Sequence, residues 1–180
     1  NETAGEHFTP REVIRLMVNL LFIEDDDILT KPGVVRSIYD PTLGTGGMVS
    51  TAEDHLLTLN PDARLVMYGQ ELNAESYAIC KADMLIRGEG GTADHIVGGA
   101  EWSTLSHDAF PGQEFDFMVA NPPYGKSWKS DLERLGGKNG IKDPRFLIEH
   151  AGDAEYSLMT RSSDGQMLFL ANMLSKMKHG

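Results

Sequence analysis

Cysteine, long apolar runs and positive charge are all scarce in this sequence. Its 180 residues include one cysteine, Cys80, so no disulfide can form within the chain, which is compatible with a reducing compartment. The six histidines show no metal-ligand spacing with Cys80, and we predict no metal site. No run of about 18 apolar residues is present to span a membrane, and no charged-then-apolar leader marks a secretory signal. We therefore expect a soluble, cytoplasmic protein with no membrane contact.

The few positive charges are unevenly distributed. With 16 basic and 27 acidic residues the net charge is −11, which argues against an autonomous, nonspecific nucleic-acid binder. Residues 126–145 are the exception, because they hold six basic and three acidic side chains and leave 10 and 24 for the remainder. Such a run is usually a solvated loop, but its position directly after Asn121–Tyr124 favours contact with phosphates.

Strand-like and helix-like stretches alternate along most of the chain. Short apolar stretches at 34–39, 64–70, 95–97 and 115–120 predict four strands, and helical patterns separate the first three. Strands joined through helices form right-handed βαβ units in a parallel sheet. The length fits one domain, so the sequence predicts an α/β fold with a doubly wound, mostly parallel sheet.

Capping patterns predict where helices begin. The segments Thr9–Glu12 and Ser163–Gln166 match the capping box, and Asn73 is placed to cap another helix. The first helix is expected to carry one apolar face, which consists of Val13, Ile14, Met17, Leu20 and Leu21. Residues 125–161 show no clear periodicity and predict a long loop.

The most informative stretch is Phe115–Gly125, where a predicted strand leads into Asn121 and two prolines. Pro122 and Pro123 have no N–H and keep the residues before them extended, so the carbonyls of Asn121 and Pro122 have no ladder or helix partner. An amide side chain, a free carbonyl and the aromatic face of Tyr124 at the carboxyl end of a strand suit a flat group that bears an NH2.

A glycine-rich loop, Asp40–Gly47, follows the first predicted strand, where doubly wound sheets bind nucleotides. Its spacing is not Gly-x-Gly-x-x-Gly, and no Lys-Ser or Lys-Thr follows a glycine to make a phosphate loop, so pyrophosphate cofactors are disfavoured. The acid of Asp40 suits an ammonium group, and Glu71, after the second strand, suits a ribose diol. Each feature alone is common in turns and caps, but their combination and order favour a site for S-adenosylmethionine.

At this point the sequence resembles a known family. Asn121–Tyr124 together with Asp40–Gly46 resembles the amino-methyltransferases, and more narrowly the DNA adenine-N6 methyltransferase (modification) subunit of type I restriction-modification systems. The segments Gly5–Arg11, Lys126–Trp128, Asp143–Phe146 and Ser163–Gln166 resemble other parts of that subunit. The resemblance implies a Rossmann-like S-adenosylmethionine-dependent methyltransferase, of which residues 1–180 would be the front part of a single catalytic domain, with the remaining strands and any recognition domain absent.

The resemblance also implies roles for individual residues. Those expected to bind the cofactor are His7, Phe8, Thr9, Pro10, Asp40, Pro41, Thr42, Gly44, Thr45, Gly46, Gly47, Glu71 and Asn121. Those expected to act on the methyl acceptor are Asn121, Pro122, Pro123 and Tyr124. The family commonly has Gly followed by Asp or Asn after the third strand, whereas this chain has Gly98–Glu101, so the contact to the cofactor adenine is left open between Glu101 and Asp94.

The implied reaction transfers a methyl group directly to an amino nitrogen. The side chain of Asn121 and the carbonyl of Pro122 would accept its two N–H groups and free its lone pair, and Tyr124 would stack on a flipped-out adenine. The expected partners are DNA, a specificity subunit and a nuclease or translocase subunit. A methyltransferase acting on a protein glutamine or an RNA base, and a nucleotide-binding scaffold without activity, are the alternatives.

Overall fold

The computed structural model describes residues 9–88, 90–137, 140–150 and 153–178 of the chain. The first half contains, in order, α1 (Arg11–Phe22), η1 (Ile23–Asp25), α2 (Asp26–Leu29), β1 (Val35–Asp40), α3 (Gly47–Leu59), β2 (Arg64–Glu71) and α4 (Ala74–Ile86). The second half contains α5 (Gly90–Ala93), β3 (Ile96–Gly98), β4 (Phe117–Met118), α6 (Lys129–Arg134), η2 (Pro144–Phe146), β5 (Leu147–His150), β6 (Asp153–Ser157) and α7 (Gln166–Leu174). No helix in these ranges is long and apolar enough to cross a bilayer.

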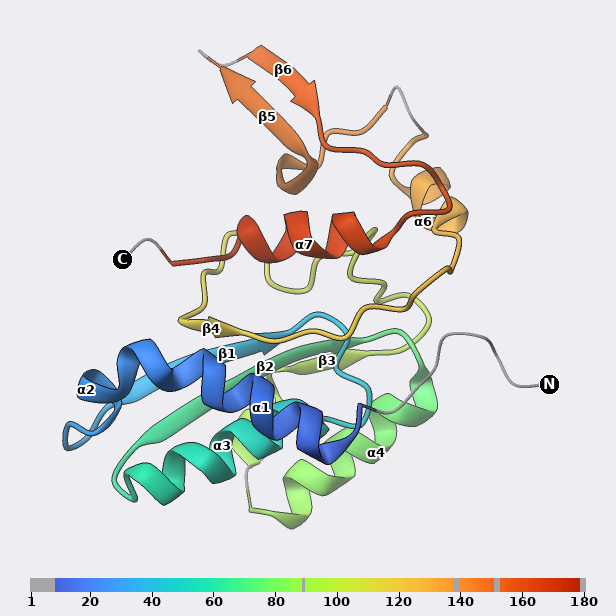
Figure 1. Cartoon of the computed structure of the whole chain (residues 1–180). Coiled ribbons are helices and arrows are strands. Elements are labelled where there is room, and N and C mark those ends of the chain that lie inside the picture. Colours follow the sequence, from blue (N-terminus) through green and yellow to red (C-terminus); the bar gives the residue numbers. More distant parts are fainter. Residues whose placement is uncertain (1–8, 89, 138–139, 151–152, 179–180) are drawn as a thin grey trace.

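The central sheet has the order β3-β2-β1-β4, and every pairing within it is parallel. Figure 1 shows α1, α3 and α4 on one face of this sheet and α7 on the other. The predicted parallel α/β architecture is therefore confirmed. Because Asp40 pairs with Gly69 and Glu71 with Gly98, the carboxyl ends of the three strands β1, β2 and β3 lie at one edge of the sheet.

Apolar side chains alternate between the two faces of the sheet, as expected for strands covered on both sides. Ile38, Met67 and Phe117 pack with helices α1, α3 and α4 in the largest core cluster. On the other face, Tyr39 stacks on Phe115 with ring centroids 4.7 Å apart. The sheet is therefore packed on both faces up to the edge where the candidate site lies.

The fourth predicted strand is shorter in the structure than its sequence pattern suggests. Regular pairing is confined to β4, which pairs with β1, while Phe115 instead forms a parallel bridge with Met177 after α7. The carboxylate of Asp116 is hydrogen-bonded to the amide and the hydroxyl of Ser37, 2.8 and 2.6 Å away. These irregular contacts interrupt the ladder on the amino-terminal side of β4.

The prediction of one long loop over residues 125–161 is wrong. This segment contains α6, η2 and the antiparallel pair β5 and β6, which projects beyond α7 (Figure 1). A hairpin gains its stability from pairing across strands, and this one has a register irregularity at Ile148 and Glu149, so no clean alternation marks it in the sequence.

Two predicted capping boxes are also absent. Pro10 is the N-cap of α1 and Gly165 that of α7, and neither helix has a side-chain cap. Asn73 does cap α4, since its side chain accepts hydrogen bonds from the amides of Glu75 and Ser76, both at 3.0 Å. Thr9 lies one residue before the N-cap of α1, and its hydroxyl accepts the tertiary hydrogen bond described below.

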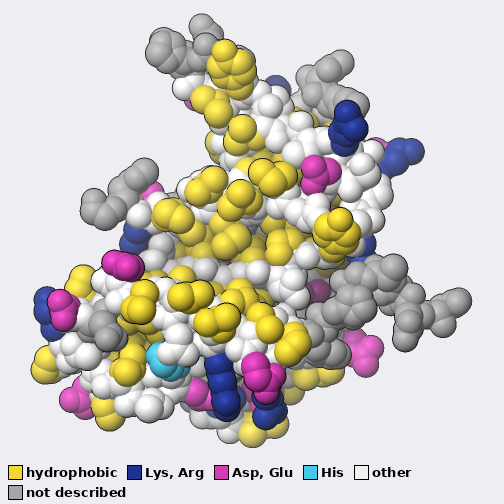
Figure 2. Space-filling model, in the orientation of Figure 1, with side chains coloured by type: hydrophobic (Ala, Val, Ile, Leu, Met, Phe, Trp, Pro, Cys, Tyr) yellow, Lys and Arg dark blue, Asp and Glu magenta, His cyan; other side chains and the backbone are white. Residues whose placement is uncertain are grey.

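The predicted apolar face of α1 is confirmed only in part, because Ile14, Met17 and Leu21 pack in the core while the other two predicted residues do not. Its buried side chains are Ile14, Val18 and Phe22. Val13 and Leu20, expected on the buried face, are 44% and 61% exposed. Figure 2 shows apolar side chains gathered on the visible surface over α1 and α7. Helix α1 is therefore apolar beyond its buried face, and its sequence pattern alone did not define the limits of that face.

Candidate active site

The loop after β1 contains glycines for two physical reasons. Gly44 and Gly46 have positive φ angles of 57° and 83°, a region in which glycine has no steric penalty. In addition, a Cβ on Gly46 would lie 2.6 Å from Sγ of Cys80 on α4. The amide of Leu43 donates to the carbonyl of Gln70 at 3.1 Å, which fixes the loop against β2.

Asp40 lies behind this loop and not on its surface. Its side chain is fully buried, and Oδ1 accepts hydrogen bonds from the amide and the hydroxyl of Thr42, at 2.8 and 3.2 Å. Oδ2 is buried and receives no hydrogen bond from the described part of the chain. Burial raises the pKa of the Asp40 carboxyl to about 7, while the hydrogen bonds of Thr42 lower it and the charge of Glu71 raises it. The group therefore titrates near neutrality.

This raised pKa predicts a pH-dependent stability. Because folded Asp40 holds its proton up to about pH 7 and the unfolded carboxyl loses it near its ordinary value of 3.8, folding is favoured at low pH. The wild type should lose stability relative to Asp40→Asn between these values, by up to about 1.4 kcal/mol per pH unit, and no further above them. Denaturant titrations of both proteins from pH 4 to pH 8 measure this difference. Parallel pH profiles would contradict it.

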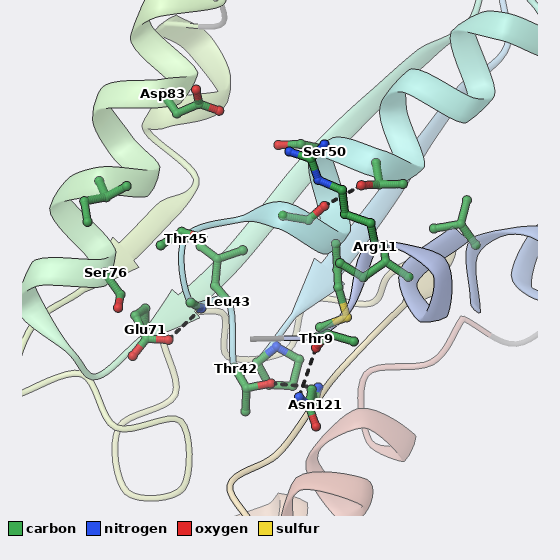
Figure 3. Close-up of a pocket in the computed structure, with 18 of the residues that line it drawn as sticks. Thr9, Arg11, Thr42, Leu43, Thr45, Ser50, Glu71, Ser76, Asp83 and Asn121 are labelled. Carbon is green, nitrogen blue, oxygen red and sulfur yellow. Dashed lines mark hydrogen bonds between the residues drawn. The ribbon is translucent and has the colours of Figure 1, made fainter. Parts of the chain in front are cut away.

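Glu71 joins the loop to the start of α4. Its Oε2 accepts a hydrogen bond from the amide of Gly44 at 2.7 Å (Figure 3). Its Oε1 accepts one from the amide of Asn73, also at 2.7 Å. A carboxylate oxygen has a second lone pair, so Glu71 can still accept hydrogen bonds from hydroxyl groups in the pocket that it lines.

Asn121 brings together three segments that are distant in the sequence (Figure 3). Its Nδ2 donates to the hydroxyl of Thr9, 112 residues earlier, at 3.0 Å. Its backbone amide donates to Oγ1 of Thr42, 79 residues earlier, at 3.2 Å. The segment before α1, the loop after β1 and the segment after β4 therefore meet at the Asn121 side chain and backbone.

A large pocket adjoins this meeting point, with a cavity volume of about 1480 Å³. Of the predicted site residues it is lined by Thr9, Pro10, Pro41, Thr42, Gly44, Thr45, Gly47, Glu71, Asn121 and Pro123. Asp40, Gly46, Pro122 and Tyr124 are not among its lining, and Tyr124 is 82% exposed. His7 and Phe8, also predicted for the cofactor, lie outside the described residues.

Some residues that line the pocket could not be predicted from the sequence. Ser103 and Thr104 line the pocket from the irregular segment after β3, which carries no periodicity. Glu101 and Asp94, the two candidates for an adenine contact, do not line it. Of the six basic residues at 126–145, Arg145 is buried and paired with Asp143 and so cannot contact phosphates, whereas Lys126 lines the pocket.

Taken together, the fold and the site define a class of protein. The parallel sheet, the glycine loop after β1, the acid at the end of β2 and Asn-Pro-Pro-Tyr after β4 are those of the Rossmann-like S-adenosylmethionine-dependent methyltransferases. More narrowly, the chain belongs to the N-6 DNA Methylase family, whose model matches residues 1–180.

Individual relatives agree with this assignment. The type I restriction enzyme MjaIX methylase subunit of Methanocaldococcus jannaschii is 31% identical over 148 residues, which are 80% of this chain and 22% of that protein. The crystal structure of a type I restriction-modification methyltransferase subunit from Streptococcus thermophilus matches with a TM-score of 0.69 and 26% identity, over 98% of this chain and 33% of that one. The predicted resemblance to these subunits is confirmed.

One relative has a different printed activity. The tRNA (guanine(10)-N2)-dimethyltransferase of Pyrococcus abyssi is 31% identical over 127 residues, which are 69% of this chain and 31% of that protein. The chain thus spans between about a fifth and a third of the length of the three proteins compared.

Proposed function

We propose that this chain transfers a methyl group from S-adenosylmethionine to the N6 amino group of a flipped-out adenine in DNA, as part of the modification subunit of a restriction-modification complex. The observation that carries the proposal is the meeting of Thr9, Thr42 and Asn121 beside a pocket that Glu71 also lines. This arrangement places residues predicted for the cofactor against residues predicted for the methyl acceptor.

The residues of the pocket fit the cofactor. S-adenosylmethionine, when bound, supplies an electrophilic methyl group on a positively charged sulfur. Glu71 offers acceptors for a ribose diol, and Gly44 and Gly47 leave the loop backbone open to close approach. The buried carboxyl of Asp40, with an oxygen that no described residue satisfies, adds negative charge behind the loop once it is ionised. The acidic groups of Asp40 and Glu71 suit a ligand that carries an ammonium and a sulfonium.

The segment after β4 fits the methyl acceptor. Oδ1 of Asn121 and the carbonyl of Pro122 are acceptors at the end of a strand, and two N–H groups bound there would direct the nitrogen lone pair away from the base plane. Tyr124 follows Pro123, which lines the pocket, and its exposed ring is open to stacking on an extruded base, worth about 1–3 kcal/mol on single-strand platforms. The cavity is larger than the roughly 300–1,000 Å³ of common small-ligand sites, which leaves room for both reactants.

DNA is favoured over other acceptors by the relatives. The M. jannaschii relative is named a restriction enzyme methylase subunit, and the S. thermophilus protein is a subunit of a type I restriction-modification system. The net charge of −11 also favours a function in a complex in which another subunit supplies much of the affinity for DNA.

Methylation of an RNA base is the second candidate, because a tRNA guanine-N2 methyltransferase is among the relatives. An exocyclic amino group is the acceptor in both cases, so the residues after β4 do not distinguish the two. A protein glutamine, which also carries a planar NH2, is a third acceptor to include in any test.

The test is methyl transfer from labelled S-adenosylmethionine by the full-length protein with its partner subunits, offered duplex DNA, RNA and protein in parallel. We expect label in DNA, recovered as N6-methyladenine after digestion. Label in RNA or protein alone would overturn the DNA assignment, and cofactor binding without transfer to any acceptor would indicate a scaffold without activity.

A further inference from the structure

Arg145 is a buried cation whose charge is balanced inside the protein. It lies in η2, two residues after the N-cap Asp143, and is 6% exposed. Nε lies 3.0 Å from Oδ1 of Asp143, Nη2 lies 2.6 Å from Oδ2, and Oδ2 of Asp108 is 3.7 Å from Nε. This two-pronged contact with Asp143 fixes the plane of the guanidinium.

The rest of the guanidinium joins three chain segments. Nη1 donates to the carbonyl of Thr104 at 2.7 Å and to Oδ1 of Asn172 on α7 at 2.8 Å. Nη2 donates to the carbonyl of Leu105 at 3.3 Å. The segment after β3, which has no regular structure of its own, is thereby fixed against η2 and α7.

Thr104 connects this segment to the Asp40–Gly47 loop. Its side chain is buried, and its hydroxyl donates to the carbonyl of Pro41 at 2.6 Å. Pro41 is directly followed by Thr42, whose hydroxyl accepts the amide of Asn121. The loop is therefore held on one side by Thr104 and on the other by Asn121, and Thr104 itself lines the pocket.

We propose that Arg145 and Thr104 are positioning residues that set the Asp40–Gly47 loop relative to Asn121. The proposal deepens the proposed function and rests on it. Arg145 has no contact with the pocket, so it acts through Thr104 and Pro41 on the placement of the cofactor against the methyl acceptor. A shift of the loop would weaken cofactor binding and, because transfer depends on alignment, would lower the rate as well.

The first test compares Thr104→Val with Thr104→Ser in the full-length protein with its partner subunits. Valine removes the hydrogen bond to Pro41 at similar volume, and serine keeps it. We expect Thr104→Val to weaken S-adenosylmethionine binding about fivefold by calorimetry, as for the loss of one hydrogen bond, and to lower kcat with an unchanged KM for DNA. Thr104→Ser should retain the wild-type affinity for S-adenosylmethionine and the wild-type kcat. Wild-type affinity and kcat in Thr104→Val would overturn the proposal.

The second test uses Arg145→Lys, which keeps the charge opposite Asp143 but loses the planar set of donors. Its matched control is Arg64→Lys, at the exposed amino end of β2, away from the site. Arg145→Lys should raise the KM for S-adenosylmethionine and lower kcat, and the control should change neither. A lower melting temperature with unchanged affinity and kcat would show a purely structural role and overturn the proposal.

The two tests separate this inference from the proposed function. If the wild-type complex methylates DNA and the variants behave like it, the positioning role is wrong and the function stands. If the wild type transfers no methyl group to DNA, the proposed function fails, while the cofactor affinities of the variants still decide whether Thr104 and Arg145 order the loop.

Discussion

Replacing Asn121 by alanine is expected to lower kcat for methyl transfer by at least about 100-fold, as for the loss of one preorganised hydrogen-bonding group in an active site. The side chain is one of the two acceptors proposed for the amino group, and alanine offers none. Asn121 is exposed, so its removal should cost little folding stability. Single-turnover transfer from labelled S-adenosylmethionine to duplex DNA measures the effect.

Cofactor affinity should change much less in this variant. Alanine removes the hydrogen bond to Thr9, which is worth about 1 kcal/mol, or roughly fivefold in affinity. Thr9→Val removes the same hydrogen bond while Asn121 remains, so it is the matched control and should retain most of kcat. Full activity of Asn121→Ala would contradict the proposed mechanism, and equal loss in both variants would assign the effect to Thr9.

Replacing Gly46 by alanine is expected to destabilise the protein by about 2–4 kcal/mol, the sum of a left-handed backbone penalty and of overpacking against α4. Gly46 has a φ of 83°, and the new Cβ would lie 2.6 Å from Sγ of the fully buried Cys80. Because Gly46 directly precedes α3 at the end of the Asp40–Gly47 loop, the affinity for the cofactor should fall as well. Denaturant unfolding and calorimetry measure the two effects.

A double-mutant cycle separates the two causes. Cys80→Ala removes Sγ and leaves Cβ of residue 80 at 3.8 Å from the added Cβ, so it should recover the packing part of the loss and not the backbone part. Gly33→Ala is the control for the backbone part, since Gly33 has a φ of 68° with no atom within 4 Å of an added Cβ. If Gly46→Ala costs no more than Gly33→Ala, the close approach of α4 is not what requires glycine.

Much of the site could be predicted because its residues follow strands directly. Asp40, Glu71 and Asn121 each come at or just after the end of a predicted strand, and in a parallel sheet such ends share one edge. The glycines of the Asp40–Gly47 loop could also be predicted, because backbone with a positive φ angle favours glycine. Local rules of backbone geometry and strand direction were sufficient for this part.

Other features could not be predicted because their partners are remote in the sequence. Thr9 fits a capping box equally well, and only the position of Asn121, 112 residues later, makes its hydroxyl a partner of the site. Arg145 looked like part of a basic surface run, yet it is buried against Asp143. The hairpin β5 and β6 was missed because pairing across strands, and not local periodicity, stabilises it.

The sequence by itself determined the order of strands, helices and glycine loop, the acids after two strands and the Asn-Pro-Pro-Tyr that marks the class, because each depends on residues near one another in the chain. The tertiary structure alone decided that Asp40 is buried behind its loop, that Thr9, Thr42 and Asn121 meet, and that Arg145 reaches the loop through Thr104. Such contacts depend on which surfaces pack together. This packing is determined by the burial of side chains over the whole fold and not by neighbouring residues in the chain.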